Sequence, residues 1–89
     1  MKIDLGEALS YQNNGALLID VRSEKEYLND HIDGAINIPV NQIVEVLSIC
    51  PDKNKKIIVY CSMGKRSFIA YRSLVSLGYK NVYELDYKK

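Results

Sequence analysis

Strand-like and helix-like segments alternate along the whole chain, and this alternation narrows the possible folds more than any other feature. Segments typical of strands lie at residues 16–21, 35–38, 57–60 and 81–85. Helix-like segments, marked by capping residues or by apolar residues at helical spacing, separate them. A chain that alternates in this way favours an α/β domain around a mostly parallel sheet.

Capping and breaking residues limit the first two predicted helices. Asp4 can cap a helix over residues 5–12, which a following Asn-Asn-Gly sequence breaks. Ser23 and Glu26 form a capping box, so a second helix begins there. We expect this second helix to continue to Gly34, because its apolar residues fall near helical spacing (Tyr27, Leu28 and Ile32).

Two further helices are predicted on either side of the strand at residues 57–60. The third runs from about residue 42 to 49, with three apolar residues facing inward (Ile43, Val46 and Leu47). It stops at or before Cys50, because the residue before a proline avoids helical angles. The fourth begins near Ser67 and ends at Gly78, with three apolar residues on one face (Ala70, Leu74 and Leu77).

Length and composition predict one small globular domain that spans residues 1–89. With 47% hydrophobic and 26% charged residues, the chain is typical of a folded protein. The formal net charge of +1 gives no support for a nucleic-acid or membrane partner, since both need a concentrated basic surface. Lys88 and Lys89 are interpreted as a solvated tail.

Several features favour a cytoplasmic protein. No apolar run is long enough to span a bilayer. The first seven residues contain acidic side chains where a signal peptide would need an apolar segment. The two cysteines, Cys50 and Cys61, do not make a disulfide framework, and we expect both to be reduced.

The segment from Cys61 to Ser67 carries the strongest functional signal. It reads Cys-Ser-Met-Gly-Lys-Arg-Ser and joins an apolar strand to a helix. Ligands of open α/β sheets bind beyond the carboxyl ends of the strands, and Cys61 lies at such an end. Backbone N–H groups at the start of the helix would surround whatever extends from the sulfur, and they favour an anion. Gly64 allows the backbone angles of a tight loop, and Lys65 and Arg66 add positive charge.

These influences predict a reactive cysteine. A helix N-terminus and nearby positive side chains both favour thiolate, the nucleophilic form of cysteine. We therefore predict that Cys61 is a partly exposed thiolate of lowered pKa that handles anionic groups. The alternative is a small core residue, because free cysteines at strand ends commonly serve that purpose.

Three segments, taken in order, resemble rhodanese-like sulfurtransferases. The loop 61–67 resembles the active-site loop of that family. Residues 17–22, Leu-Leu-Ile-Asp-Val-Arg, followed by Glu26 and Tyr27, resemble the first family signature. Residues 31–39, His-Ile-Asp-Gly-Ala-Ile-Asn-Ile-Pro, resemble the second. The resemblance, which spans roughly residues 3–86, implies a rhodanese-like three-layer α/β/α fold around a mostly parallel sheet of about five strands.

The resemblance also implies a sulfur-transfer mechanism. Cys61 would attack the outer sulfur of thiosulfate or of a persulfide donor, become a persulfide, and pass that sulfur to a thiol or to cyanide. The loop would bind the anionic donor and stabilise the persulfide (Ser62, Met63, Gly64, Lys65, Arg66 and Ser67). No metal or organic cofactor is required. Protein donors or acceptors are compatible with the same chemistry.

The length of the loop distinguishes sulfur transfer from phosphoryl transfer. Four residues lie between Cys61 and Arg66, whereas the dual-specificity phosphatases and arsenate reductases of the same fold have five. The longer loop accommodates a tetrahedral phosphate or arsenate, so the shorter loop favours a single extra sulfur. A cysteine phosphatase or arsenate reductase remains an alternative, as does a non-catalytic module that presents the fold to a partner.

Four residues outside the loop also call for interpretation. We expect Asp20 and Arg22 to form a supporting hydrogen-bond or ion-pair network, because a buried carboxylate needs partners. His31 matches a structural position of the second signature, and a thiolate favoured by its loop needs no separate base. Cys50 could resolve a Cys61 persulfide as a disulfide, but a small apolar contact is the simpler interpretation.

The C-terminal end departs from the family pattern. Most members continue after the last strand with a Gly-Gly turn and a tryptophan-bearing helix, whereas this chain contains no tryptophan. We expect that terminal helix to be missing, so that either other residues fill the space or an apolar patch is exposed. A homodimer across that flank is therefore a hypothesis alongside a monomer.

Overall fold

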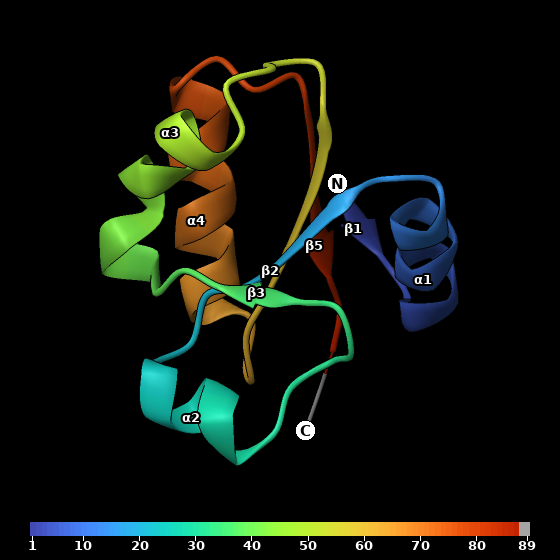
Figure 1. Cartoon of the computed structure of the whole chain (residues 1–89), viewed down its shortest axis with the longest axis vertical. Helices are drawn as coiled ribbons and strands as arrows, with labels where there is room; N and C mark the ends of the chain where they lie inside the picture. The colour runs from blue at the N-terminus through green and yellow to red at the C-terminus, as the bar shows by residue number, and fades with distance from the viewer. Residues whose placement is uncertain (88–89) are drawn as a thin grey trace.

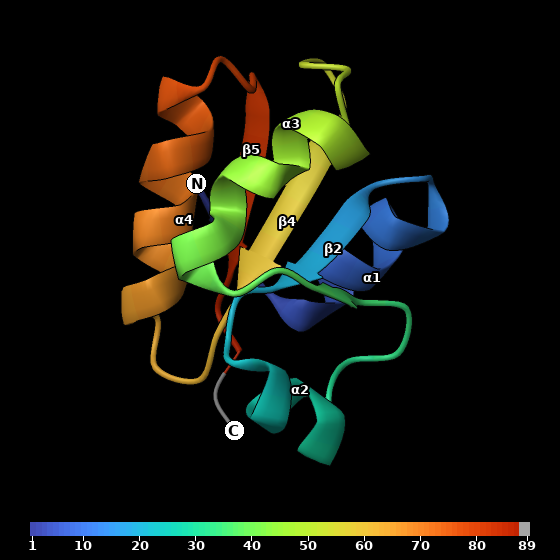
Figure 2. The same cartoon turned by 60° about the vertical axis from the view of Figure 1, so that its left-hand side comes forward.

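A five-stranded sheet in which all neighbouring strands are parallel forms the centre of the protein (Figures 1 and 2). The computed structural model describes residues 1–87. The strands lie in the order β1-β5-β4-β2-β3. Their bounds are Lys2–Ile3 for β1, Leu17–Asp20 for β2, Ile36–Asn37 for β3, Lys56–Tyr60 for β4 and Asn81–Leu85 for β5. The predicted α/β class and parallel sheet are confirmed.

Helices cover both faces of the sheet and make the three predicted layers. Their bounds are Leu5–Asn13 for α1, Glu24–Asn29 for α2, Val46–Ile49 for α3 and Lys65–Ser76 for α4, with a 3₁₀ helix η1 at Val40–Glu45. Figure 1 shows α1 on one side of the sheet and η1, α3 and α4 on the other. The short helix α2 lies beyond the carboxyl ends of β2 and β4.

Strand β4 has buried side chains on both of its faces, which explains its uninterrupted apolar run. Ile57 and Val59 join the core on the side of α4, while Ile58 and Tyr60 join the core on the side of α1. A central parallel strand packed on both faces requires this pattern. Cys61 follows directly, so the core holds its backbone in place.

The observed α2 begins as predicted but ends earlier. Its capping box is present, because Glu26 N–H donates to Ser23 Oγ at 3.2 Å. The helix stops at Asn29, not at Gly34, so the predicted extension was wrong. Two core side chains bind the backbone beyond that point. Arg22 donates to Asp30 O at 2.7 Å, and Ile32 N–H donates to the Tyr60 hydroxyl at 3.0 Å.

The exposed position of Leu28 shows why the spacing of apolar residues predicted too long a helix for α2. Leu28 lies within the helix with 71% of its surface exposed, so it contributes nothing to the core. Its neighbour Tyr27 instead packs against the core and donates its hydroxyl to Ala35 O at 2.6 Å. One partly buried side chain therefore anchors this short helix to the core.

The predicted third helix is divided into η1 and α3. Gln42 has non-helical angles inside η1, and the α-helical hydrogen bonds begin only at Val46. Ile43 and Val46 are buried as predicted, and the helix ends before Cys50 as predicted. Leu47 is more exposed than the continuous helical pattern implied.

Two other boundaries differ from the predicted ones by small amounts. Helix α4 begins at Lys65, two residues before the predicted start, because Gly64 makes the turn into it with a φ of 90°. Strand β1 was not predicted, since two residues carry no periodicity. Its pairing with β5 is visible only in the fold, where Glu84 N–H donates to Met1 O at 2.9 Å.

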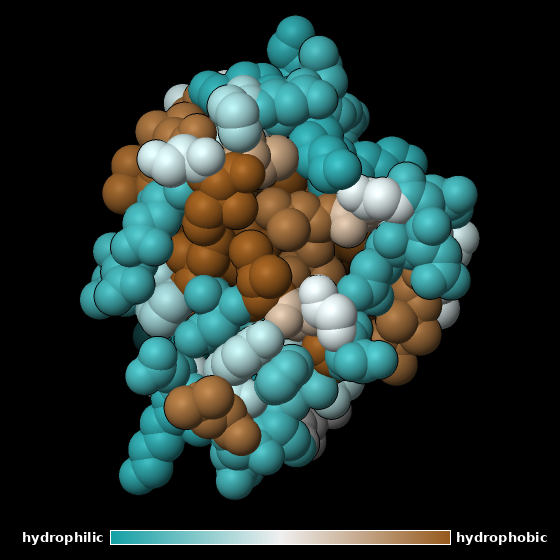
Figure 3. All heavy atoms as spheres, in the orientation of Figure 1, coloured by the Kyte–Doolittle hydropathy of each residue, from teal (hydrophilic) through white to brown (hydrophobic). Residues whose placement is uncertain are grey.

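Apolar side chains also reach the surface. On the face viewed in Figure 3 they gather beside η1 and α3 and over the neighbouring part of the sheet. None of the helices that the structure describes is both long and apolar enough to cross a bilayer. The predicted solvated tail, Lys88 and Lys89, lies outside the described residues.

The segment after β5 packs against the core on the side of α1. Tyr87 packs edge-on against Tyr60, with ring centroids 5.4 Å apart. Tyr87 and Tyr83 both contact the core on the side of α1. These aromatic side chains therefore cover part of the core beside β4 and β5.

Candidate active site

The sulfur of Cys61 lies inside a loop of backbone N–H groups at the carboxyl end of β4. Gly64 N–H donates to Cys61 Sγ at 3.1 Å, and Ser67 N–H donates to it at 3.3 Å. Cys61 is only 2% exposed, so the predicted partial exposure was wrong. The loop folds around the sulfur, and the same contacts that would hold an anion also shield the thiol from solvent.

Ser67 contacts the sulfur with its side chain as well. The Cys61 thiol donates to Ser67 Oγ at 3.4 Å, and Ser67 Oγ–H donates to Gly64 O at 3.1 Å. Ser67 is buried, which fixes its hydroxyl beside the sulfur. When the thiol loses its proton, the hydroxyl can rotate and donate to the thiolate instead.

Burial and hydrogen bonding act in opposite directions on the cysteine. Burial of the thiol disfavours its charged form, but hydrogen bonds from Ser67 and from the backbone of Gly64 and Met63 more than offset that effect. The pKa of Cys61 is therefore below its ordinary value, in the predicted direction. The hydrogen-bond donors are the main cause of the lowered pKa, and the Arg66 guanidinium interacts electrostatically with Cys61 as well.

Gly64 is required by its backbone conformation and not by lack of space. Its φ is 90°, in the left-handed region that side chains disfavour. A Cβ atom built on Gly64 would meet no other atom within 4 Å. The glycine therefore lets the chain reverse around the sulfur and enter α4 with its N–H groups directed at Cys61.

The cationic residues of the loop have different environments. Arg66 donates to both carboxylate oxygens of Glu26, with Nη1 to Oε1 at 2.6 Å and Nη2 to Oε2 at 3.1 Å. Arg66 Nη2 also donates to Ser62 Oγ at 3.2 Å. Lys65 and Met63 are exposed at the outer side of the loop. The structure thus ties the Arg66 guanidinium to α2, whereas the sequence predicted only a general positive charge.

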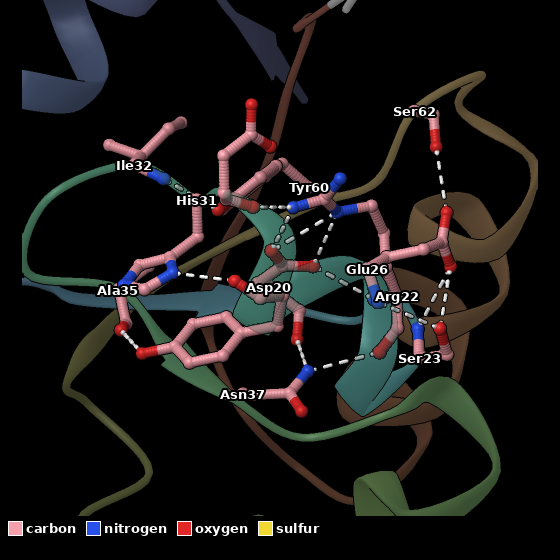
Figure 4. A network of polar contacts seen from close by, with 12 residues as sticks. Asp20, Arg22, Ser23, Glu26, His31, Ile32, Ala35, Asn37, Tyr60 and Ser62 are labelled. Carbon is pink, nitrogen blue, oxygen red and sulfur yellow. Dashed lines mark hydrogen bonds and ion pairs between the residues drawn. The ribbon is translucent and has the colours of Figure 1, made fainter.

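Glu26 is the residue of the site that sequence reasoning missed. Its carboxylate accepts from Arg66 and also from Ser23 N–H at 3.1 Å in the capping box, with Ser62 Oγ at 3.4 Å (Figure 4). The Arg66 hydrogen bond and then the Ser23 backbone bond lower the pKa of Glu26 from 4.5 to about 2. The capping box marked Glu26 in the sequence, but it gave no sign of a contact 40 residues away.

Asp20 and Arg22 form the buried ion pair that was expected (Figure 4). Arg22 Nη2 lies 2.7 Å from Asp20 Oδ2, and Arg22 Nε lies 3.0 Å from Oδ1. The hydrogen bond with Asp20 raises the pKa of Arg22. Asn37 of β3 donates to the backbone oxygens of both residues at 3.0 Å. The network holds the ends of β2 and β3 in register beside α2.

His31 and Cys50, the two remaining candidates, lie in different parts of the fold. His31 Nδ1 is 2.7 Å from Tyr27 O, and its ring stacks on Tyr27 with centroids 3.7 Å apart. These contacts tie His31 to the end of α2. Cys50 is buried in the core beside α3, and both cysteines are free thiols.

Comparisons with known proteins identify the family. The family model described as the rhodanese-like domain matches residues 4–87. Thiosulfate sulfurtransferase PspE of Escherichia coli (strain K12) is 42% identical over 65 residues, which cover 72% of this chain and 62% of that protein. The tRNA uridine(34) hydroxylase of Buchnera aphidicola subsp. Baizongia pistaciae is 39% identical over 79 residues, which cover 83% of this chain and 25% of that protein.

A solved structure agrees over almost the whole chain. The human single-domain sulfurtransferase TSTD1 superposes with a TM-score of 0.84 at 28% sequence identity, covering 99% of this chain and 90% of that one. This chain spans less than two thirds of the length of the two curated relatives. The match of the family model and these likenesses agree, and the chain belongs to the rhodanese-like domain family.

Proposed function

We propose that the protein is a sulfurtransferase in which Cys61 carries the transferred sulfur as a persulfide. The observation that carries this proposal is the set of hydrogen bonds from Gly64 and Ser67 to Cys61 Sγ. Donors that favour the thiolate also suit the negative charge of a persulfide. The similarity to PspE, a thiosulfate sulfurtransferase, supports the same chemistry.

The first half-reaction loads the cysteine. The Cys61 thiolate attacks the outer sulfur of thiosulfate, a sulfur–sulfur bond forms, and the sulfur–sulfur bond of the donor breaks. Sulfite leaves with the electron pair, so no external oxidant is needed. A small persulfide could replace thiosulfate, with its thiolate as the leaving group.

The second half-reaction returns the cysteine to its starting state. A thiolate or cyanide attacks the terminal sulfur of the Cys61 persulfide, and the Cys61 thiolate leaves with the electron pair. The Cys61 persulfide is the product of the first half-reaction and the reactant of the second, so ping-pong kinetics are expected. Neither step calls for a metal or an organic cofactor.

The loop residues divide the remaining work. We propose that the backbone N–H groups from Met63 to Ser67 hold the persulfide, while Lys65 attracts the anionic donor from the outer side. Arg66 keeps its charge near the sulfur but serves mainly to position the loop through Glu26. The pair Asp20–Arg22 supports the same edge from beneath. Two free thiols suit a reducing compartment, so we propose a cytoplasmic location.

Intact-protein mass spectrometry after incubation with thiosulfate tests this function directly. The wild-type protein and a Cys50→Ser control should each gain the mass of one sulfur, and cyanide should remove it. Cys61→Ser should gain nothing. No mass gain in the wild type, with thiosulfate or with a small persulfide, would refute the proposal and leave a binding module. Aryl phosphate hydrolysis that disappears in Cys61→Ser would replace it with a phosphatase.

A further inference from the structure

A cleft of about 260 Å³ opens beside the Cys61 loop. Gly64 and Ser67, which both hydrogen-bond to Cys61 Sγ, form one wall. Glu84, Leu85 and Tyr87, at and just after the end of β5, also line it. The cleft therefore approaches the reactive sulfur through the residues that hold it.

Glu84 is the unusual member of this lining. Its side chain lines the cleft although the residue is only 6% exposed. Within residues 1–87, the Glu84 carboxylate has no hydrogen bond and no ion pair within 4.0 Å, in contrast to the buried Asp20. Lys2 lies opposite Glu84 in the β1–β5 register and also lines the cleft, yet it does not reach the carboxylate.

Among the described residues no fully buried side-chain oxygen or nitrogen lacks a hydrogen-bond partner, so the unpaired carboxylate oxygens of Glu84 are open to solvent at the cleft. A carboxylate placed in this way in a narrow cleft favours a cation beside it. A ligand with an ammonium group can supply that charge and donate hydrogen bonds to Glu84. The volume lies below the range of about 300–1,000 Å³ that is typical for drug-sized ligands, so the ligand must be small. Leu85 and Tyr87 offer an apolar wall for a short hydrocarbon chain.

We propose that this cleft binds the sulfur acceptor, and that the acceptor is a small thiol with a primary amino group. The inference rests on the proposed sulfurtransferase function. With its ammonium on Glu84 and its hydrocarbon chain along Leu85 and Tyr87, such a molecule directs its thiol toward Gly64 and Ser67. Its thiolate then attacks the terminal sulfur of the Cys61 persulfide. The new sulfur–sulfur bond forms as the bond to Cys61 Sγ breaks, and the acceptor thiol proton goes to solvent.

Two thiols of equal length test this assignment. Cysteamine carries an ammonium group where 2-mercaptoethanol carries a hydroxyl group. The readout is the ratio of kcat/KM for cysteamine to kcat/KM for 2-mercaptoethanol, measured with thiosulfate as donor. Comparing the same ratio between variants removes the intrinsic difference in reactivity between the two thiols. Exposed Glu45, away from the cleft lining, provides the matched control Glu45→Gln.

We expect Glu84→Gln to lower the ratio about tenfold, because it removes a charge-assisted hydrogen bond to the acceptor. Lys2→Met should raise the ratio about twofold, because an exposed ammonium next to Glu84 no longer repels that of the acceptor. Glu45→Gln should leave the ratio unchanged. An unchanged ratio in Glu84→Gln would overturn the proposal. If Glu84→Gln does not fold, a ratio that fails to rise in Lys2→Met would overturn it instead.

Cyanide separates the failure of this inference from the failure of the proposed function. A wild-type protein that forms the persulfide and passes sulfur to cyanide is a sulfurtransferase whatever happens in the cleft. If its thiol ratio is then insensitive to Glu84→Gln, only the acceptor assignment is wrong. If no persulfide forms at all, the proposed function itself fails, and the acceptor assignment with it.

Discussion

Arg66 and Glu26 form a two-point ion pair that joins the Cys61 loop to the first turn of α2, with contacts of 2.6 and 3.1 Å. Glu26 is at the same time part of the capping box of α2, because its carboxylate accepts from the N–H of the N-cap residue Ser23. One carboxylate thus holds both a helix start and the loop that surrounds the sulfur. The position of the loop depends on the integrity of α2, although α2 contributes little to the core.

Neutralising Glu26 should lower activity more than it lowers stability. Glu26→Gln keeps an oxygen for the capping bond to Ser23 but loses the ion pair with Arg66, so the loop is held less firmly. We expect kcat/KM for thiosulfate to fall about tenfold, since small errors in placement near a reacting atom are costly. The control is Glu24→Gln, an exposed residue of the same helix turn. Equal turnover of the two variants would contradict the positioning role.

The lowered pKa of Glu26 predicts a pH-dependent contribution to stability. Its folded-state pKa is about 2, below the ordinary 4.5, so the unfolded state binds the proton more tightly. The stabilisation is fully present above about pH 4.5 and is lost as the pH falls toward 2. The difference in unfolding free energy between wild type and Glu26→Gln should therefore shrink over that interval, as measured by urea denaturation. A difference that stays constant from pH 6 to pH 2.5 would exclude this linkage.

Removing the Ser67 hydroxyl should raise the pKa of Cys61. The hydroxyl is the largest of the contributions that favour the thiolate, and Ser67→Ala retains the backbone donor. Thiolate absorbance near 240 nm, or the rate of alkylation by iodoacetamide against pH, reports the shift. At neutral pH we expect alkylation to slow about fivefold, the equivalent of one ordinary hydrogen bond. Ser76→Ala, on an exposed turn of the same helix, is the control. A titration curve that does not move would show that the backbone donors suffice.

Breaking the buried pair of Asp20 and Arg22 should destabilise the whole domain. Asp20→Asn leaves the Arg22 charge buried with weaker partners, and such losses cost about 3–5 kcal/mol. Urea denaturation measures the free energy of unfolding. The double variant Asp20→Asn with Arg22→Met should lose less than the sum of the two single variants, because each single change leaves a partner unpaired. Strict additivity would mean that the two side chains do not depend on each other.

The boundaries that sequence reasoning predicted well are those set by local chemistry. The start of α2 depends on the capping bonds between Ser23 and Glu26, which lie three residues apart. Strand β5 was predicted with its observed bounds because its residues alternate toward two packed faces. The end of α2 was missed because Arg22 and Tyr60 capture the backbone of Asp30 and Ile32, and no local pattern encodes that contact.

The sequence by itself determined the parallel α/β fold, the placement of Cys61 at a strand end, and the glycine loop that follows it. These features depend on periodicity, on capping within a few residues, and on the conformational freedom of Gly64. Only the tertiary structure decided that Cys61 is shielded, that Arg66 is tied to Glu26, and that Glu84 lines a cleft beside the loop. The reason is physical: burial and ion pairing depend on distances between segments that the fold brings together from opposite ends of the chain.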